Sequence, residues 1–353
     1  MPELIAKTAG GDYPITIRKG ALHKTGQIAA EICRGRRVCI VSDETVWPLY
    51  GEIVSKSLDQ ADFTVFKTLV PPGEISKSYE QLLALYGSFS EAGINRADLI
   101  VALGGGVVGD LTGFAAATWL RGVPLIQIPT TLLAQVDSSI GGKTAIDLPF
   151  GKNLAGAFYQ PRAVIMDPSV LVSLSRSRTS DGMAEVIKYG LIRDLSLFEQ
   201  IESKAYDLEW VLERCVRTKI TVVSNDERDT GERMLLNFGH TVGHAIEKAT
   251  NYERYTHGEA VAIGMVTAAR VGEKLGETPV GTAERIIRVL ESYKLPVSTD
   301  LPLTDILPII ASDKKNMGSR LYFVLLKDIG EAFLKPMKRA ELSELLQEVW
   351  QHA

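Results

Sequence analysis

Three of the five histidines of this chain, His240, His244 and His257, fall within eighteen residues. The first two lie in the stretch NFGHTVGHAIE. On a helix they share one face with Asn237 and Glu247, because the four positions are spaced at i, i+3, i+7 and i+10. The two glycines of the stretch lower helix propensity, which makes sense if something must approach the backbone closely. The stretch therefore predicts a helix with a polar stripe along an apolar body.

These histidines have the chemistry to hold a metal ion. The spacing of His240 and His244 is that of the zinc helix H-E-x-x-H, but threonine stands where a metalloprotease carries its general base. A catalytic zinc ion needs a third protein ligand. Candidates are His257, which starts another helical stretch, and Glu185, an acid in an otherwise apolar one. A lone helical histidine is usually structural, but three clustered histidines and an acid favour a metal site.

A glycine-rich stretch, ALGGGVVGDLTG, follows a predicted strand and opens a predicted helix. Gly104, Gly106 and Gly109 satisfy G-x-G-x-x-G, a loop that lets backbone N–H groups reach a pyrophosphate. The Rossmann pattern also needs an acid about 20 residues later, and positions 124–131, PLIQIPTT, contain none. The stretch favours a phosphate or dinucleotide loop without the standard Rossmann layout. The alternative is a tight turn that needs small residues.

A long segment rich in glycine and serine, residues 135–156, carries two lysines. We expect a loop here, because helical periodicity is weak. Lysine acts as a mobile point charge and glycine lets the backbone approach, so the segment suits phosphate binding. A solvated loop with ordinary surface lysines is the alternative, but long loops in compact domains are more often functional.

The composition is that of an ordinary globular protein, with 45% hydrophobic and 23% charged residues. A net charge of −4 offers no electrostatic footprint for nucleic acid or an anionic membrane, so local lysines and arginines must hold any anionic ligand. The three cysteines have no metal spacing, and Cys33 and Cys39, which lie in or beside apolar runs, are expected as buried thiols. The chain shows no signal peptide and no apolar run of membrane-spanning length, so we expect a cytoplasmic protein.

The elements that must position these residues fall into two parts. Short apolar runs alternate with helical stretches in the first half, which predicts a mostly parallel sheet with helices on both faces. The predicted strands are 36–43, 62–70, 98–106, 123–131 and 161–169. Beyond residue 180 the signal is helical, with one short strand at 321–326. We therefore predict an α/β domain over 1–165 and a helical domain over 166–353.

Ten stretches follow one another in the order of a known family: PPGEISKS (71–78), GGGVVGD (104–110), RGV (121–123), IPTTLLAQVDSSIGGKTAID (128–147), GKNLAGAFYQP (151–161), AEVIKYG (184–190), NDERD (225–229), RMLLNFGHTVGHAIE (233–247), HGEAVAIGM (257–265) and DKKN (313–316). In these motifs the chain resembles the 3-dehydroquinate synthases. A match on one motif arises easily by chance, but ten matches in sequence do not.

The resemblance implies a Rossmann-like NAD-binding α/β domain and an all-α metal-binding domain, related to the glycerol dehydrogenases and usually assembled as a homodimer. The implied reaction, a step of the shikimate pathway, converts 3-deoxy-D-arabino-heptulosonate 7-phosphate into 3-dehydroquinate and phosphate. NAD+ would oxidise the C5 hydroxyl and later take back the hydride, so that it is recycled. The transient ketone would permit β-elimination of phosphate, followed by reduction, ring opening and an intramolecular aldol closure.

The resemblance also implies roles for individual residues. Glu185, His240 and His257 match the ligands of a zinc or cobalt ion, which would polarise the hydroxyl being oxidised. His244 matches a substrate-site histidine that is not a ligand, and Asp137 matches an active-site acid. The groups that bind the substrate's phosphate, carboxylate and hydroxyls match Lys152, Asn153, Lys188, Lys219, Arg233, Asn237 and Lys315.

Further positions match the cofactor site and the dimer. Arg121 matches an arginine that reaches the phosphate site of the partner subunit. The NAD contacts match Asp43, Glu74, Lys77, Gly106, Val107, Val108, Gly109, Asp110, Thr130, Thr131, Lys143, Lys152 and Ser173. Two positions depart from the family pattern: Asp229 stands where glutamate is common, and Ser173 stands where threonine is common. Both keep the chemical group.

Three alternatives remain open. Another sugar phosphate cyclase could act on sedoheptulose 7-phosphate or an amino analogue, but enzymes acting on sedoheptulose phosphate generally lack the second histidine of G-H-x-x-G-H, which is His244 here. A metal-dependent polyol dehydrogenase would release NADH, but Lys143, Lys152 and Lys188 favour a phosphorylated acidic substrate. A catalytically dead regulatory homologue is the third alternative, and no predicted ligand position is missing.

Overall fold

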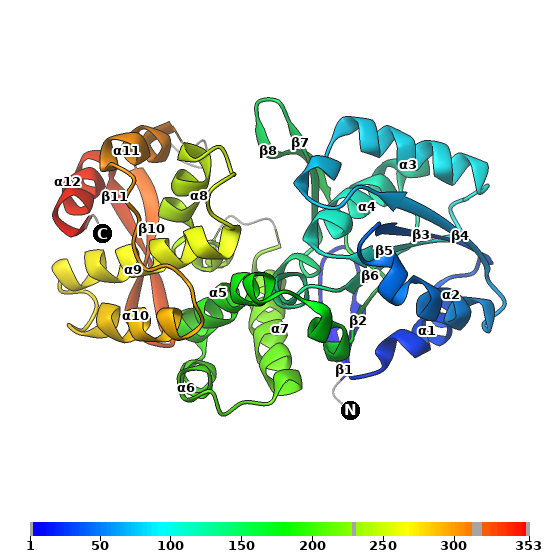
Figure 1. Cartoon of the computed structure of the whole chain (residues 1–353), viewed down its shortest axis with the longest axis horizontal. Helices are drawn as coiled ribbons and strands as arrows, with labels where there is room; N and C mark the ends of the chain where they lie inside the picture. Colours follow the sequence, from blue (N-terminus) through cyan, green and yellow to red (C-terminus); the bar gives the residue numbers. More distant parts are fainter. Residues whose placement is uncertain (1–2, 228–230, 313–319, 351–353) are drawn as a thin grey trace. The chain divides into compact units, whose positions relative to one another are not determined.

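The computed structural model describes residues 3–227, 231–312 and 320–350, which fall into two compact units (Figure 1). The first unit comprises the described residues up to Ser175 together with Lys219–Glu227. The second comprises Arg176–Thr218 and the described residues from Gly231 onward. The boundary expected near residue 165 falls on the last strand of the first unit. The return of a later segment to the first unit has no counterpart in the expected division.

The first unit is built on a seven-stranded sheet with the order β1-β2-β9-β6-β5-β3-β4. All neighbouring strands are parallel except β1 and β2. The strands are β1 (Glu3–Ala6), β2 (Tyr13–Ile17), β3 (Arg37–Asp43), β4 (Thr64–Val70), β5 (Leu99–Gly104), β6 (Leu125–Pro129) and β9 (Ala163–Met166). The five predicted strands are confirmed as β3, β4, β5, β6 and β9. The strands β1 and β2 were not predicted.

Helices cover both faces of this sheet, which confirms the expected fold class (Figure 1). They are α1 (Thr25–Ile32), α2 (Glu52–Asp59), α3 (Tyr79–Glu91) and α4 (Gly106–Thr118). Alternate residues of β3 point to opposite faces, as the strand period requires. Val38 and Ile40 enter the apolar cluster beneath α1 and α2, whereas Cys39 and Val41 enter the cluster beneath α3 and α4. Because both faces of β3 are buried, most of its residues are apolar and do not alternate with polar ones.

The order of strand connections reverses between β3 and β5. Strand β3 pairs with β4 on one side and with β5 on the other, so the chain moves outward to β4 before returning past β3. Ligands of open α/β sheets bind beyond the carboxyl ends of the strands at such a reversal. The strands end there with Asp43 and Gly104. The topology thus places an acid and the glycine loop at the expected ligand-binding position.

A two-stranded antiparallel hairpin replaces most of the loop expected over 135–156. A π-helical turn, Ala134–Ser138, leads to β7 (Lys143–Leu148), which pairs with β8 (Gly151–Phe158). The expectation of a long loop is therefore wrong for this part of the segment. Its glycines hid the pairing, because Gly156 lies so close to the opposite strand that a Cβ there would be 2.1 Å from the Thr144 carbonyl oxygen.

The second unit is mainly helical. Its elements are α5 (Arg176–Arg193), α6 (Leu195–Ser203), α8 (His240–Ala249), α9 (His257–Lys274), α10 (Thr282–Ser292), α11 (Leu303–Ser312), α12 (Arg339–Val349) and an antiparallel pair, β10 (Arg320–Asp328) with β11 (Glu331–Lys338). Helix α7 (Leu208–Asn225) belongs to this unit up to Thr218 and to the first unit from Lys219. The single short strand predicted at 321–326 is one half of the hairpin β10–β11.

Helix α9 is the centre of the second unit. It packs against α5, α8, α10 and α12, and its residues are buried around most of its circumference, including Ala260, Val261, Ala262 and Ile263. A helix that is buried on most sides is a core helix. In the described residues, no helix is both long and apolar enough to cross a membrane.

The start of α8 and the middle of α9 meet through their backbones. A Cβ on Gly264 would lie 1.9 Å from the carbonyl oxygen of Gly239. Gly239 itself has φ +79°, which an L side chain rarely adopts. One helical turn further, a Cβ on Gly243 would lie 3.1 Å from the Ala260 backbone. The expectation that something approaches the backbone of NFGHTVGHAIE closely is confirmed, and the approaching element is α9.

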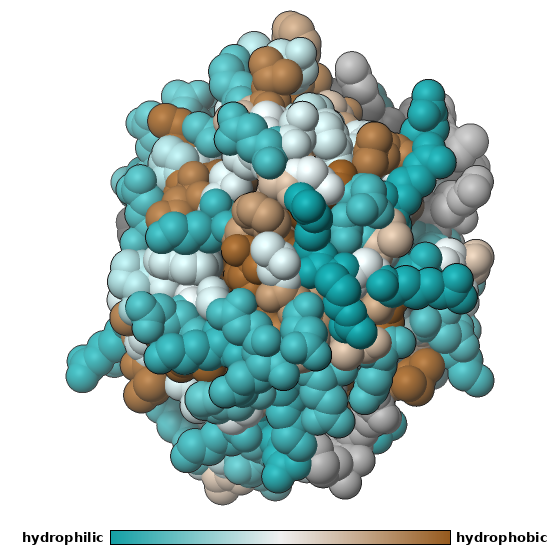
Figure 2. Space-filling view, turned by 90° about the vertical axis from the view of Figure 1, so that its right-hand side faces the viewer, coloured by the Kyte–Doolittle hydropathy of each residue, from teal (hydrophilic) through white to brown (hydrophobic). Residues whose placement is uncertain are grey.

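The surface visible in Figure 2 is mainly hydrophilic, with small hydrophobic patches separated by polar side chains. Large exposed apolar side chains of the first unit include Ile75, Tyr79, Leu83, Phe150 and Leu154. Isolated exposed apolar residues are ordinary on globular proteins.

The link between α5 and α6 depends on Asp194. Its Oδ1 accepts hydrogen bonds from the Leu197 N–H (3.1 Å) and the Ser196 hydroxyl (2.7 Å), and its Oδ2 accepts one from Arg214 Nε (2.6 Å). Burial raises the pKa of this carboxyl, but these donors outweigh it and the pKa lies below its usual range. Asp194 therefore caps α6 as a carboxylate.

We expect Asp194→Ala to lower the free energy of unfolding by about 1–2 kcal/mol at neutral pH, through loss of the cap. Asp194→Asn keeps a cap oxygen and removes only the charge. Because the folded pKa is depressed, the charge stabilises the fold above the unfolded pKa of about 4, and this effect disappears as the pH falls through the folded pKa. Urea unfolding of wild type and Asp194→Asn across this pH range measures the difference. A gap between the two proteins that does not shrink in acid would contradict the assignment.

Candidate functional site

Three side chains of the second unit form a cluster with the composition of a metal site. Glu185, His240 and His257 each offer a ligand atom, and these atoms lie within 4.8 Å of one another. Glu185 Oε1 is 3.5 Å from His240 Nε2 and 3.7 Å from His257 Nε2. The structure thus brings together the three residues that the sequence analysis matched to metal ligands.

Three different helices deliver these side chains. Glu185 lies in the middle of α5 and is fully buried. His240 is the first residue of α8, directly after the left-handed Gly239. His257 is the first residue of α9, where the Thr256 and Glu259 side chains form a capping box. Both histidines therefore stand at helix starts whose backbone geometry is fixed by local features.

The His240 imidazole is held for binding through Nε2. Its Nδ1 lies 3.1 Å from the Phe238 carbonyl oxygen, so a proton on Nδ1 leaves the lone pair of Nε2 directed towards Glu185. Burial first, and then the positive charges of Lys188 and the neighbouring histidines, lower the pKa of His240 well below its usual value. The ring is therefore neutral, which is the form that binds metals.

The His257 imidazole faces two carboxylates. Its Nδ1 lies 3.4 Å from Glu247 Oε2, while its Nε2 faces Glu185. Burial lowers the pKa of His257, but the hydrogen bond and charge of Glu247, followed by the charges of Glu185 and Asp181, raise it to about 9. A cation bound at Nε2 would replace a proton there.

The buried Glu185 carboxylate is the feature that best fits a cation. Neither of its oxygens accepts a hydrogen bond from the residues that the structure describes. The Lys188 ammonium contacts one of them, and Lys188 is itself buried. Buried carboxylates without hydrogen bonds are rare, because desolvation is costly. One carboxylate oxygen and two imidazole nitrogens suit zinc or cobalt with an open position.

His244 lies beside this cluster but outside it. It is one turn beyond His240 and is exposed, and its ring centroid is 5.3 Å from that of His240 and 6.0 Å from that of His257. A second group of possible ligand atoms, formed by His244, Glu247 and His257, shares only His257 with the first. The helical spacing alone left His240 and His244 as a possible pair, whereas the geometry joins His240 with Glu185 and His257.

The polar stripe is shorter than predicted. Asn237 ends a 3₁₀ turn, Glu232–Asn237, and α8 begins only at His240. The prediction that Asn237 shares a helix with the histidines is therefore wrong, because Gly239 turns the backbone into the left-handed region. Arg233, in the same 3₁₀ turn, is buried. The expected site residue Lys315, and Asp229, which departs from the family pattern, lie outside the described residues.

The glycine loop of the first unit has the form of an anion site. Gly105 caps α4 in an extended conformation, and no described side chain caps this helix. A Cβ on Gly106 would lie 2.9 Å from the Ser138 hydroxyl, and one on Gly105 would lie 3.1 Å from Thr131 Cγ2. Val107, Val108, Gly109 and Asp110 follow in the first turns of α4. A bound pyrophosphate requires backbone N–H groups that no side chain caps, and small residues that let it come close to the backbone.

Asp43 lies at the position of the missing Rossmann acid. It ends β3, which pairs with β5, so it lies beside the start of the glycine loop. Its Oδ1 accepts hydrogen bonds from the Thr45 and Val46 N–H groups, at 2.8 and 2.9 Å. The Rossmann spacing did not predict Asp43, because Asp43 precedes the glycine loop by two strands instead of following it.

A buried lysine connects several predicted cofactor contacts. Lys77 Nζ lies 2.9 Å from Asp110 Oδ2 and 3.8 Å from Glu74 Oε1, and it donates a hydrogen bond to the Asn153 side chain. Burial lowers the pKa of Lys77, but the charges of Asp110 and Glu74 outweigh it and the pKa is raised. Lys152 extends the network, with its Nζ 3.6 Å from Glu74 Oε1. These side chains form one charged network.

Asn153 enters this network in a strained conformation. Its φ is +55°, and its N–H donates to Asp147 Oδ1 at 2.7 Å. The Asp147 N–H in turn donates to the Lys77 carbonyl oxygen, also at 2.7 Å. Asp147 therefore positions the hairpin against Lys77. The sequence analysis did not single out Asp147. The only indication of its importance was that it ends the stretch 128–147, which matches the family pattern.

The remaining expected residues of the first unit lie in several different elements. Lys219 is buried and its Nζ lies 2.7 Å from Asp137 Oδ1. Thr130 donates its N–H to the Gly104 carbonyl oxygen at 2.9 Å, and Lys143 begins β7. The Ser173 hydroxyl donates to the Val170 carbonyl oxygen (2.9 Å) and accepts from Tyr50 (2.8 Å). The structure therefore shows a structural use for Ser173.

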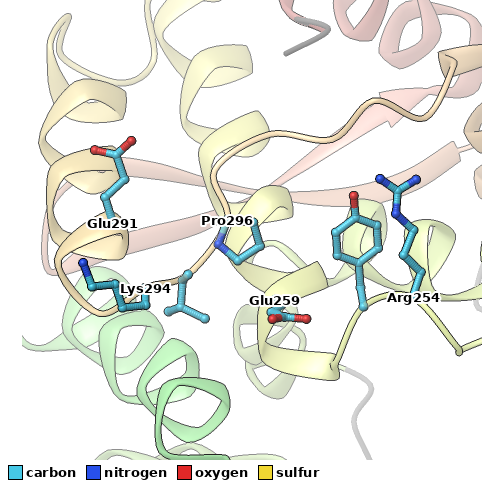
Figure 3. Close-up of a pocket in the computed structure, with 7 residues that line it drawn as sticks. Arg254, Glu259, Glu291, Lys294 and Pro296 are labelled. Carbon is cyan, nitrogen blue, oxygen red and sulfur yellow. The ribbon is translucent and has the colours of Figure 1, made fainter. Parts of the chain in front are cut away.

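The second unit also has an open surface depression of about 590 Å³ (Figure 3). Its lining is of mixed charge and comprises Arg254, Tyr255, Glu259, Glu291, Lys294, Leu295 and Pro296. Within the described residues, none of the lining side chains belongs to the predicted metal or cofactor sets. This depression is therefore distinct from the candidate site.

The sequence of the chain also matches those of known proteins. Models of the 3-dehydroquinate synthase N-terminal and C-terminal regions match residues 67–181 and 182–316. A 3-dehydroquinate synthase from Clostridium acetobutylicum is 46% identical over 99% of this chain and 100% of its own. One from Clostridium botulinum is 47% identical over 95% of this chain and 98% of its own.

The chain belongs to the 3-dehydroquinate synthase family. Among solved structures, a 2-deoxy-scyllo-inosose synthase complexed with carbaglucose-6-phosphate, NAD+ and Co2+ has a TM-score of 0.86 and 27% identity, covering 99% of this chain and 100% of that one. This chain and the inosose synthase thus share one fold.

We expect the His240→Ala variant to lose bound zinc or cobalt, because the substitution removes one of the three proposed ligand atoms. His244→Ala should keep the metal and turn over more slowly. Metal-to-protein ratios after desalting, measured by elemental analysis on folded protein, distinguish the two variants. Full occupancy in His240→Ala would refute the ligand assignment.

Proposed function

We propose that this chain is a 3-dehydroquinate synthase that converts 3-deoxy-D-arabino-heptulosonate 7-phosphate into 3-dehydroquinate and phosphate. The observation that carries the proposal is the full-length similarity to 3-dehydroquinate synthases, at 46% identity over 99% of the chain. The cluster of Glu185, His240 and His257 supplies the matching chemistry. The enzyme uses NAD+ and a divalent metal ion.

We propose that the first unit is the NAD-binding domain. The N–H groups at the start of α4 would hold the pyrophosphate, and Asp43, at the end of β3, would bind a ribose hydroxyl. Lys77, Asp110 and Asn153 hold one another in place, and so fix the hairpin beside the glycine loop. Bound there, NAD+ supplies a two-electron acceptor that is restored within the same turnover.

We propose that the second unit holds the metal and much of the substrate. Glu185, His240 and His257 are the ligands, and the metal supplies a Lewis acid for the substrate's hydroxyl groups. The exposed His244 stands beside the cluster, where it can hold or move a proton at its imidazole. Lys188 balances the charge of Glu185, and the buried Arg233 offers a guanidinium to an anionic substrate group.

The remaining lysines of the first unit are proposed to bind the acidic substrate. Lys152 lies beside Glu74, and Lys219 is held by Asp137, so each ammonium has a defined place before substrate arrives. Preorganised cations cost less to align with a phosphate or carboxylate. Lys143, exposed at the start of β7, is assigned to the cofactor.

We place the reaction in the cytoplasm. None of the three cysteines, all of which lie in the described part of the chain, forms a disulfide, and all three are buried. Buried free thiols are typical of reducing compartments.

We expect the purified protein, with NAD+ and metal, to release phosphate from 3-deoxy-D-arabino-heptulosonate 7-phosphate without net NADH. Phosphate release and absorbance at the NADH band, followed together, provide the measurement. Steady NADH accumulation would indicate a polyol dehydrogenase. Turnover of sedoheptulose 7-phosphate alone would indicate another cyclase. Wild type and His240→Ala, compared on both substrates, control for contaminating phosphatase activity.

We further propose a homodimer in which Arg121 serves the partner's phosphate site. Arg121 is exposed, with φ +67° beside Leu120 at φ +51°, so two adjacent residues hold an unfavourable conformation. Exposed apolar residues of the same unit, such as Ile75 and Phe150, offer contact area.

Mixing inactive variants tests the assignment of Arg121. If Arg121 acts on the partner, co-refolded Arg121→Ala and His240→Ala chains should regain about a quarter of wild-type activity, because half of the dimers are mixed and each has one intact site. The matched control, Glu185→Ala with His240→Ala, should regain none, because every site lacks a ligand. No recovery in the first mixture would place Arg121 in its own chain's site.

A further inference from the structure

Glu247 is the one acid of the polar stripe that the function so far leaves without a role. It lies near the end of α8 and is buried, at 7% exposure. We propose that Glu247 is a positioning residue that holds the His257 imidazole for the metal, an inference that rests on the metal centre of the proposed function.

The two nitrogens of His257 face two different carboxylates. Nδ1 lies 3.4 Å from Glu247 Oε2, and Nε2 lies 3.7 Å from Glu185 Oε1. A carboxylate beside Nδ1 retains the proton on that nitrogen and leaves the lone pair of Nε2 for a metal ion. Glu247 thus selects both the tautomer and the direction of the ring.

His257 depends on this contact more than His240 depends on any side chain. The Nδ1 of His240 is satisfied by the backbone carbonyl oxygen of Phe238, two residues earlier, at 3.1 Å. His257 stands at the start of α9, and its Nδ1 partner comes from a different helix. The orientation of one ligand is therefore set locally, whereas that of the other is set by tertiary structure.

The backbone around Glu247 keeps its carboxylate in place. The Glu247 carbonyl oxygen accepts hydrogen bonds from the Tyr252 N–H (2.7 Å) and the Thr250 hydroxyl (3.2 Å), which fix the turn after α8. The start of α9 is fixed by the Gly258 N–H, which donates to Asp181 Oδ1 at 2.6 Å. Both partners of the contact therefore have defined positions.

Glu247 could instead be a metal ligand, since it forms a group of possible ligand atoms with His244 and His257. Two observations favour the positioning role. Glu247 faces Nδ1 of His257, whereas the fully buried Glu185 and His240 Nε2 share the side of Nε2. The carboxylate that lacks hydrogen bonds within the described residues is Glu185.

The test measures Co2+ binding to metal-stripped protein by titration, with the visible absorption of bound Co2+ as a second readout. Glu247→Ala should weaken Co2+ binding about 10–100-fold, the usual effect of losing such a partner. Glu247→Gln should bind within a few-fold of wild type with an unchanged spectrum, because its amide oxygen still accepts the bond. Glu247→Asp keeps the charge but is too short, and should bind more weakly than Glu247→Gln.

A matched control removes the same charge elsewhere on the unit. Glu273→Gln lies near the far end of α9, where its carboxylate accepts a hydrogen bond from the Ala283 N–H at 2.8 Å. This variant should bind Co2+ as wild type does. If circular dichroism shows that Glu247→Ala does not fold, the Co2+ affinities of Glu247→Gln and Glu247→Asp test the proposal instead. Weaker binding by Glu247→Gln than by Glu247→Asp would overturn it.

The outcomes separate the possible roles. Equal, severe loss in Glu247→Gln and Glu247→Ala, with an altered spectrum, would make Glu247 a ligand and overturn the proposal. Unchanged affinity in folded Glu247→Ala would also overturn it. Wild-type Co2+ binding that is lost in Glu247→Ala and kept in Glu247→Gln would support it, even if no phosphate were released from the heptulosonate. Failure of the enzymatic function is thereby distinguished from failure of the positioning role.

Discussion

The contact between the Gly239 carbonyl and Gly264 is the constraint on which the metal centre depends. A Cβ at Gly264 would lie 1.9 Å from that oxygen, so the contact excludes any other residue. It brings the first turn of α8 against α9, and the histidines at the starts of these helices then meet beside Glu185. Most of the remaining residues of α9 are buried, because it is the core helix of the unit. Chemistry and packing are therefore built on the same backbone contact.

The two units use charge in different ways. In the first unit, Lys77 contacts Asp110, Glu74 and Asn153 near the start of α4. The N–H groups there have no capping side chain among the described residues and can bind an anion. In the second, a desolvated carboxylate is surrounded by imidazoles and an ammonium. The fold itself does not choose the substrate, since an inosose synthase with 27% identity shares it at a TM-score of 0.86. Substrate selection therefore depends on individual side chains, and we propose the exposed His244 as one of them.

Buried strands and the histidine cluster could be predicted from the sequence, because their signals are local. The strands β3, β5 and β6 are mainly apolar and buried, and His240 and His257 stand at helix starts. Features that depend on distant pairing could not be predicted. The pairing of β3 with β5 brings Asp43 to the glycine loop from upstream. A glycine is visible at 239, but its left-handed φ, which removes Asn237 from the helix, is not. The ligand roles themselves came from the family resemblance.

The ion pair of Lys188 affects how the protein can fold before it has bound a metal ion. Because its ammonium already contacts the Glu185 carboxylate, the buried negative charge is balanced before any cation arrives. Small zinc domains fold only around their ion, because metal binding supplies their folding free energy. Here the chain carries its own counter-ion, so folding need not wait for the metal. The choice among divalent ions then depends on the geometry and type of the ligands and on which ion the cell supplies, rather than on raw affinity.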